Sequence, residues 1–258
     1  MTRVLFVTGA SRGIGRAIAE RGVARGFVVG ALARDGAALA ALAADHPAGS
    51  ILPLPCDVRD ADAVAAAVAE LDARAGAPQL VVHAAGVLGP VGPAWEARGP
   101  ELADAIATSA VGCANVAAAT VPAMRAAGAG ALVAISASAA TRVFRGWAAY
   151  AAAKAALDAY IRNLAAEVGQ EPGIVVFSFV PGLTRTRLQE ELLALDEDRF
   201  PDVRRFRRWH AMGAAKEPER VAEILEAVLA GPRDGLNGSV VDAEEFERER
   251  RRALLGTR

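Results

Sequence analysis

Short apolar runs rich in β-branched residues alternate with long alanine-rich segments along most of this 258-residue chain. The runs predict seven buried β-strands, which begin near Arg3, Phe27, Ser50, Gln79, Gly130, Gly173 and Gly238. The segments between them, such as DADAVAAAVAELDARAG and PERVAEILEAVLAG, have the composition of helices. Strands that are apolar throughout and are separated by helices indicate parallel βαβ units with both faces of the sheet covered. We therefore expect a doubly wound α/β fold: a seven-stranded parallel sheet with helices on both faces.

Nothing in the composition marks a second domain, so we expect a single domain over residues 1–242. Two segments depart from the alternating pattern. Residues 183–215 are polar and rich in arginine, interrupt the last βαβ unit, and are expected to form a substrate lid. Residues 243–258 form a charged tail, which we interpret as a solvated helix; contact with a partner is the less favoured alternative.

Charge and composition exclude several classes of function. The formal net charge of -1 argues against a general affinity for nucleic acid or for an anionic membrane. The first apolar run meets Gly9 too soon to be a signal or membrane helix, so we expect a cytoplasmic protein. Cys56 and Cys113 lie far apart and are interpreted as reduced thiols. The three histidines form no cluster with cysteines or carboxylates at ligand spacing, so no metal site is expected.

The sequence VTGASRGIG lies directly between the first expected strand and the first expected helix. Gly9, Gly13 and Gly15 allow a tight turn and close approach of the backbone, and the amides at the helix start favour a pyrophosphate. This strand–turn–helix context predicts a Rossmann-type dinucleotide site, with a tight turn that binds no ligand as the alternative.

The charge at the end of the second strand indicates which dinucleotide would bind. An NAD site usually has an acidic residue there for the ribose 2′-hydroxyl, whereas an NADP site has basic residues for the 2′-phosphate. In GALARDG, Ala33 occupies the position of the acid and Arg34 follows it. Arg12 in the glycine turn adds a second cation, and Asp35 is better interpreted as the cap of the next helix. We therefore expect NADP(H) as the cofactor.

Tyr150 and Lys154 stand four residues apart in the run AAYAAAKAALDAY and share one face of the helix that this run predicts. Together with the glycine turn, CDV after the third strand and HAAG after the fourth, the pair makes the chain resemble the short-chain dehydrogenase/reductase family from Thr2 to about Asp242. The stretch FRGWAAYAAAKAALD is similar to the sepiapterin reductase and benzil reductase branch. The resemblance implies NADPH-dependent reduction of a ketone or diketone carbonyl by a homodimer or homotetramer.

By this resemblance, Tyr150 protonates the carbonyl oxygen and Lys154 also holds the nicotinamide ribose. A lysine ammonium one turn away favours the phenolate, so we expect it to lower the pKa of the tyrosine. The residues that the resemblance implies around the cofactor are Gly9, Ser11, Arg12, Gly13, Ile14, Gly15, Arg34, Asp57, Val58, Ala84, Ala85, Gly86, Tyr150, Lys154, Pro181, Gly182, Thr184 and Thr186. Candidates for the substrate pocket are Leu88, Trp95, Phe144, Trp147, Trp209 and Asp242, the last standing where sepiapterin reductase anchors its pterin.

Two catalytic positions depart from the family pattern. The position of the family serine holds Ala137, and we favour Ser138 over Ser136 as its replacement, brought round by a bend at the strand end. The family's helix asparagine aligns with Ser109, whereas Asn115 stands six residues further on. Losing one oxyanion donor costs about 10²–10³ in rate. The alternative function is therefore a nucleotide-binding sensor or scaffold with weak or no catalysis.

Overall fold

The computed structural model describes residues 2–169, 173–233 and 235–256, and its centre is a seven-stranded sheet. The strands are β1 (Arg3–Thr8), β2 (Phe27–Ala33), β3 (Ile51–Pro55), β4 (Leu80–His83), β5 (Gly130–Ile135), β6 (Ile174–Val180) and β7 (Val240–Asp242). They lie in the order β3-β2-β1-β4-β5-β6-β7, and every pair of neighbours is parallel. The fold class and all seven strands expected from the sequence are confirmed.

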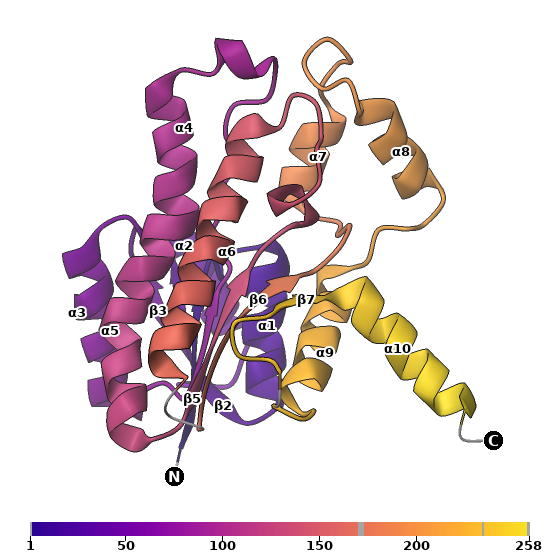
Figure 1. Ribbon diagram of the computed structural model, residues 1–258. Helices are drawn as coiled ribbons and strands as arrows, with labels where there is room; N and C mark the ends of the chain where they lie inside the picture. The colour runs from indigo at the N-terminus through magenta and orange to yellow at the C-terminus, as the bar shows by residue number, and fades with distance from the viewer. Residues whose placement is uncertain (1, 170–172, 234, 257–258) are drawn as a thin grey trace.

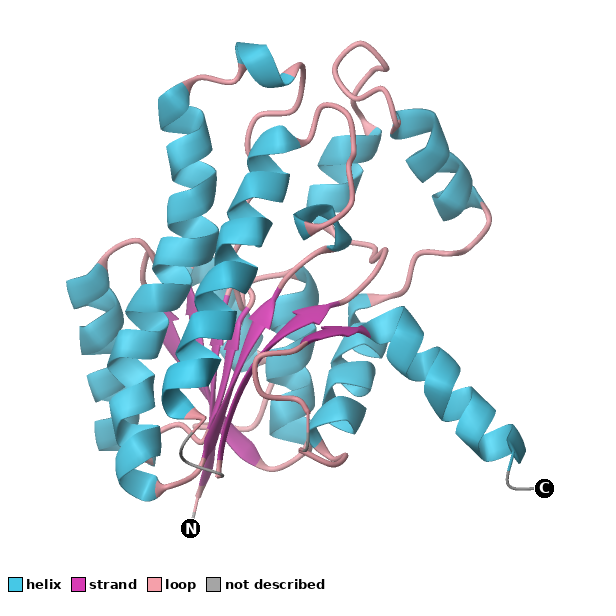
Figure 2. Ribbon diagram, viewed as in Figure 1, coloured by secondary structure: helices cyan, strands magenta, loops and turns pink. Residues whose placement is uncertain are grey.

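Helices cover both faces of the sheet (Figures 1 and 2). One face carries α3 (Ala61–Ala75), α5 (Gly112–Ala127) and α6 (Ala148–Val168), and the other carries α1 (Gly13–Ala24), α2 (Gly36–Ala44) and α9 (Pro218–Leu229). Side chains of β1 alternate between the two cores: Val4 and Phe6 pack with the first set of helices, Leu5 and Val7 with the second. Because successive side chains of a strand point to opposite faces, a strand buried on both sides must be apolar throughout.

The order of the strands reverses between β1 and β4. The chain winds outward from β1 to β3 and then crosses back to β4, which pairs with β1 on its free side. Thr8 and His83 are register partners at the carboxyl ends of these two strands. In open parallel sheets, ligands bind in the crevice at such a reversal, outside the carboxyl ends of the strands.

The segment expected to form a lid, residues 183–215, contains two helices, α7 (Arg187–Leu193) and α8 (Val203–Ala211). Figure 1 shows both beyond the carboxyl ends of the strands. At the base of the segment Thr184 and Lys216 form a parallel β-bridge. Phe200 and Phe206 from this segment join Trp147 and Tyr150 in a third apolar cluster, separate from the two sheet cores.

The helical stretch Gly99–Ala127 is long and apolar enough to cross a membrane by length and composition, with a mean hydropathy of 1.4 over 18 of its residues. It consists of α4 (Gly99–Ile106), the π-helical turn η2 (Ala107–Val111) and α5, and α5 packs into the sheet core. Within the turn, the Gly112 N–H bonds to the carbonyl of Ala107, five residues back. Such π-helical turns are rare and often occur at functional sites.

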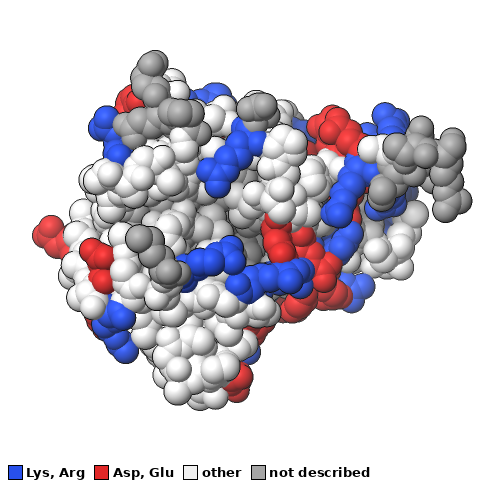
Figure 3. Space-filling model, turned by 90° about the horizontal axis from the view of Figure 1, so that it is seen from below, with Lys and Arg blue, Asp and Glu red and all other residues white. Residues whose placement is uncertain are grey.

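The helix α10 (Ala243–Gly256) covers most of the charged tail and extends away from the body of the molecule (Figures 1 and 2). Residues 257 and 258 of that tail lie outside the described residues. Asp242 caps α10, because its Oδ1 accepts bonds from the amides of Glu244 and Glu245. An ion pair between Arg220 of α9 and Glu247 ties the helix to the body. On the face seen in Figure 3, acidic and basic side chains lie side by side among uncharged ones.

Candidate active site

A cavity of about 810 Å³ lies at the carboxyl ends of the strands, between the glycine turn, the start of α6 and the helices α7 and α8. All the residues that the family resemblance implies around the cofactor line this cavity. The serines on either side of Ala137 and most of the candidate pocket residues line it as well. One continuous space therefore joins the dinucleotide end to the proposed proton donor.

The glycine turn leaves the backbone amides at the start of α1 accessible to a ligand. A Cβ on Gly9, whose φ is +68°, would lie 2.9 Å from the carbonyl carbon of Ala84. A Cβ on Gly15 would lie 2.3 Å from the carbonyl oxygen of Gly9. Neither position accepts a side chain, and α1 has no side-chain cap and no acidic residue in its first turn. Uncapped amides at a helix N-terminus are suited to a pyrophosphate, so the turn fits a dinucleotide.

Two arginines line the end of the cavity next to β2. Arg12 and Arg34 are both exposed there, and neither forms an ion pair or a side-chain hydrogen bond with any residue in the described ranges. Asp35 caps α2 by accepting a 3.0 Å bond from the Ala38 amide, as the sequence suggested. Asp57 is engaged by Arg59, whose hydrogen bonds hold the pKa of that carboxyl below its usual range. Asp57 is thus bonded mainly to Arg59, and its carboxyl also feels the charge of Arg34.

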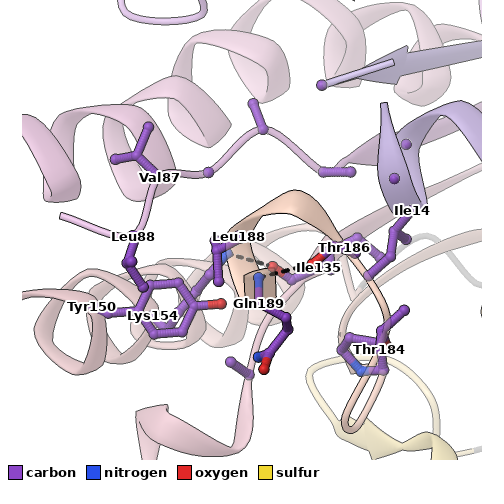
Figure 4. Close-up of a pocket in the computed structure, with 18 of the residues that line it drawn as sticks. Ile14, Val87, Leu88, Ile135, Tyr150, Lys154, Thr184, Thr186, Leu188 and Gln189 are labelled. Atoms are coloured by element: carbon purple, nitrogen blue, oxygen red, sulfur yellow. Dashed lines mark hydrogen bonds between the residues drawn. The ribbon is translucent and has the colours of Figure 1, made fainter. Parts of the chain in front are cut away.

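Tyr150 and Lys154 lie on the first two turns of α6, which begins at Ala148. The Lys154 Nζ donates a 2.7 Å hydrogen bond to the carbonyl of Ile135 at the end of β5, and it lies 5.8 Å from the centroid of the Tyr150 ring. Figure 4 shows the pair on one side of the cavity with Leu88, and Ile14 and Thr186 on the other side. The spacing of four residues therefore brings both side chains to one cavity wall.

Burial shifts the pKa values of both groups. It raises the pKa of Tyr150 to about 12. It lowers the pKa of Lys154 to about 8, against the opposing charge of Asp158. The lowered tyrosine pKa expected from the sequence is wrong for the protein alone, because loss of solvation in the aromatic cluster outweighs the attraction of an ammonium bonded to Ile135. At neutral pH the phenol keeps its proton and is able to donate it.

Beyond β5 the chain stays extended through Ala137 and then turns. Ala137 has extended backbone angles and packs against the aromatic cluster, and a 3-10 turn, η3 (Ser138–Ala140), begins at the next residue. The Ser136 hydroxyl is buried and has no hydrogen-bond partner among the described residues. Ser138 is half-buried and lines the cavity. The turn thus begins at Ser138 and not before it, and the role of Ser138 stays a prediction.

Ser109 lies in η2 and is fully buried, and its hydroxyl has no hydrogen-bond partner within the described part of the chain. A Cβ built on Gly86 would lie 3.4 Å from the Lys154 Nζ and 3.8 Å from the Ser109 Oγ. Both polar atoms therefore border the same small space. Asn115 is engaged elsewhere, since its Nδ2 donates a 2.9 Å bond to the carbonyl of Val58.

Aromatic rings form the wall around Tyr150. Trp147 is stacked on the tyrosine ring, and Phe144 and Phe206 meet the indole edge to face. Leu88, Phe144, Trp147, Trp209 and Asp242 all line the cavity. The structure does not bring Trp95 there: it lies on the short turn η1 (Ala94–Glu96), is 86% exposed and is absent from the cavity wall. From the sequence, a tryptophan in a loop between prolines gives no indication of which way its side chain points.

The sequence argument missed His83 and the contributions of Phe200 and Phe206. His83 is fully buried between β1 and η2 and hydrogen-bonds to both. The sequence did offer a signal: a histidine at the end of an otherwise apolar strand is expected to be buried, and a buried imidazole requires hydrogen-bond partners for its nitrogens. The two phenylalanines lie in the arginine-rich segment, where the charged residues obscured their apolar spacing.

Comparison with known proteins matches residues 3–196 to the family model described as short chain dehydrogenase. An uncharacterized oxidoreductase of Myxococcus xanthus is 35% identical over 191 residues, which cover 72% of this chain and 74% of that one. A benzil reductase of Bacillus subtilis, described as (S)-benzoin forming, is 30% identical over 116 residues, or 45% of this chain and 47% of that one. Among solved structures, the KRED1-Pglu enzyme superposes with a TM-score of 0.85 at 29% identity, covering 93% of this chain and all of the other.

Proposed function

This chain belongs to the short-chain dehydrogenase family of oxidoreductases acting on carbonyl or CH–OH groups, and we propose that it is an NADPH-dependent reductase of ketones or diketones. The observation that carries the proposal is the arrangement of one cavity: Tyr150 and Lys154 line it together with the open glycine turn. A protonated phenol beside a dinucleotide cradle is suited to deliver a proton to a carbonyl oxygen.

When bound, NADPH supplies the hydride for the carbonyl carbon. The glycine turn would hold its pyrophosphate, and Lys154 its ribose. Tyr150 gives the proton of its hydroxyl to the carbonyl oxygen, and the nearby Lys154 ammonium stabilises the phenolate that remains. Ser138 donates a hydrogen bond to the same oxygen in place of the family serine, which its place in the cavity wall supports.

The preference for NADP(H) over NAD(H) is supported by the charges around β2. Arg12 and Arg34 line the cavity and form no ion pair within the described residues, and Ala33 stands where an acid would bind a ribose hydroxyl. A 2′-phosphate between these two guanidinium groups gains charge-assisted hydrogen bonds that the hydroxyl of NADH lacks.

The substrate proposed is a flat, apolar carbonyl compound, of which an aromatic vicinal diketone is the leading candidate. Trp147, Phe144 and Trp209 line the substrate end of the cavity, and aromatic walls suit flat ligands. The similarity to a benzil reductase points to the same class. A pterin remains the second candidate because Asp242 lines the cavity, although its Oδ1 caps α10.

We also propose a cytoplasmic homodimer or homotetramer that uses the face of α4 and α5. Only 33% of an 18-residue apolar part of Gly99–Ala127 is buried in the single chain, and Val111 is 46% exposed on this stretch. An apolar helix face of this length favours contact with a second copy. As residues 183–215 border the cavity through α7, we propose that they act as its lid.

The test is oxidation of NADPH by the wild-type protein with four substrates: an aromatic vicinal diketone, an aliphatic diketone, a simple aryl ketone and an oxidised pterin. The proposal expects turnover of the aromatic diketone, with its hydroxyketone as product. NADPH binding without oxidation by any of the four would support the sensor or scaffold alternative.

A further inference from the structure

His83, at the carboxyl end of β4, connects two elements on either side of it through its ring. Its Nδ1 lies 3.0 Å from the Thr8 hydroxyl at the end of β1. Its Nε2 lies 3.1 Å from the carbonyl oxygen of Ser109 in the π-helical turn η2. Both nitrogens of a side chain with no exposed surface are therefore hydrogen-bonded.

The bonding partners fix which nitrogen carries the proton. The Ser109 carbonyl only accepts, so the Nε2 must donate to it. A neutral imidazole then accepts at its Nδ1, where the Thr8 hydroxyl donates. The Thr8 oxygen in turn accepts a 3.2 Å bond from the Ala85 amide, next to the cavity residue Gly86. Three hydrogen bonds therefore run in one direction, from the Ala85 amide in the loop after β4, through Thr8 and His83, to η2.

Burial and the nearby charge of Lys154 keep the ring neutral by lowering the pKa of His83 to about 3. Gly112, at the start of α5, leaves room for the imidazole. A Cβ there would lie 3.4 Å from the His83 Cε1 and 2.8 Å from the Val58 side chain. The imidazole is thus a fixed spacer between the sheet and the helix that contains η2, and it does not titrate at physiological pH.

The turn η2 contributes a polar side chain, Ser109, to the surroundings of Lys154. The Ser109 hydroxyl is buried, has no hydrogen-bond partner among the residues that the structure describes, and borders, with the Lys154 Nζ, the space beside Gly86. Because Ser109 lies within η2, the form of this turn decides where its hydroxyl lies relative to that space. Catalytic groups must be held within a fraction of an ångström, because small displacements cost large factors in rate.

We propose that His83 is a positioning residue for the carbonyl reduction: by donating its Nε2–H to the Ser109 carbonyl, it holds η2 in the π-helical form that sets Ser109 beside Lys154. The role rests on the reductase function proposed above. It would allow Ser109 to support Lys154 at the position where the family has an asparagine.

The test compares two amide replacements of different reach. His83→Gln retains an N–H near the place of the Nε2, whereas His83→Asn is one methylene shorter and has a donor only near the place of the Nδ1. Thr120→Val is the matched control, because it removes another buried hydroxyl, bonded to the Val116 carbonyl within α5. Each variant is assayed for kcat and KM with NADPH and an aromatic diketone, and for hydrogen exchange of the amides of residues 107–113.

His83→Asn should lower kcat by about ten- to a hundredfold with little change in the KM for NADPH, and the amides of residues 107–113 should exchange faster. His83→Gln should recover most of kcat and of the protection. Thr120→Val should lower the melting temperature and leave both other readouts unchanged.

Wild-type kcat and wild-type exchange in His83→Asn would overturn the proposal. Equal losses in His83→Asn and His83→Gln would also overturn it, since they would indicate a packing role only. Thr8→Val gives a second check that does not alter the histidine: the Nδ1 loses its partner, so the ring is held less firmly and the amides of residues 107–113 should exchange faster than in the wild type. The exchange readout needs no turnover, so a failure of the reductase assay with all proteins would count against the proposed function alone.

Discussion

The indole ring of Trp147 lies parallel to the phenol ring of Tyr150, with the centroids 4.6 Å apart and 17° between the planes. Trp147 directly precedes α6 and Tyr150 lies in its first turn, so the stack fixes the tyrosine from the N-terminal side. Lys154 lies one turn further along the same helix, 5.8 Å from the ring centroid. The proposed proton donor is thus held between an aromatic plane and a cation.

Replacing Trp147 should cost both stability and activity. The indole is 4% exposed and contacts Phe144, Phe200 and Phe206. Trp147→Leu should lower the free energy of unfolding by about 2–4 kcal/mol and reduce kcat, because the ring loses its packing and Tyr150 its stacking partner. Trp95→Leu is the control: its side chain is 86% exposed, so urea unfolding should detect a change of no more than about 0.5 kcal/mol. Equal losses in the two variants would contradict the assigned packing.

Arg34→Ala should weaken NADPH binding about tenfold or more and leave NADH binding nearly unchanged. One charge-assisted contact to a phosphate contributes about 1–3 kcal/mol. The dissociation constants are measured by titration of protein fluorescence. Arg16→Ala serves as control, since Arg16 pairs with Glu20 and does not line the cavity. Equal affinity of the wild type for the two cofactors would exclude NADP(H) specificity.

The role assigned to Ser138 makes opposite predictions for neighbouring positions. Ser138→Ala should lower kcat about 10²-fold, as the loss of one oxyanion donor does. Ser136→Ala should leave kcat nearly unchanged, because that hydroxyl is buried and unpartnered in the described structure. Ala137→Ser should give no gain if Ser138 already acts. A rise in kcat with Ala137→Ser and none of the loss with Ser138→Ala would show that the donor is missing.

The buried ammonium of Lys154 should make stability depend on pH. Its pKa is lowered from 10.5 to about 8, so between these values the unfolded chain holds a proton that the folded protein has released. The free energy of unfolding should therefore rise with pH across this window, by up to about 3 kcal/mol, relative to a Lys154→Met variant. The difference between the two proteins isolates this group from Cys113, whose pKa burial raises to about 12. Parallel pH profiles would contradict the lowered pKa.

The strands and the dinucleotide end of the site were predictable from the sequence because their signals are local. An apolar run such as FVVGALA forms a buried strand wherever it lies, and a strand followed by VTGASRGIG gives the cradle at once. The cap formed by Asp35 was predictable for the same reason. Such features depend on residues within a few positions of one another.

The substrate end was less predictable because it depends on contacts between distant segments. Phe206 meets Trp147 only through the fold of residues 183–215, and no local pattern shows that Trp95 faces away. The π-helical form of ATSAV has no sequence signature, and its hydrogen bond to His83 joins residues 26 positions apart. The direction of the Tyr150 pKa shift was misjudged because the sequence reveals the neighbouring charge but not the extent of burial.

The most direct test of proton donation by Tyr150 is the single-turnover rate of NADPH oxidation with an aromatic diketone, at saturating cofactor. Tyr150→Phe removes only the hydroxyl, and Tyr160→Phe is the matched control, since Tyr160 packs against the sheet core and does not line the cavity. The account predicts a loss of at least about 10²-fold in Tyr150→Phe, with NADPH affinity retained, and a wild-type rate in Tyr160→Phe. A wild-type rate in Tyr150→Phe would contradict it.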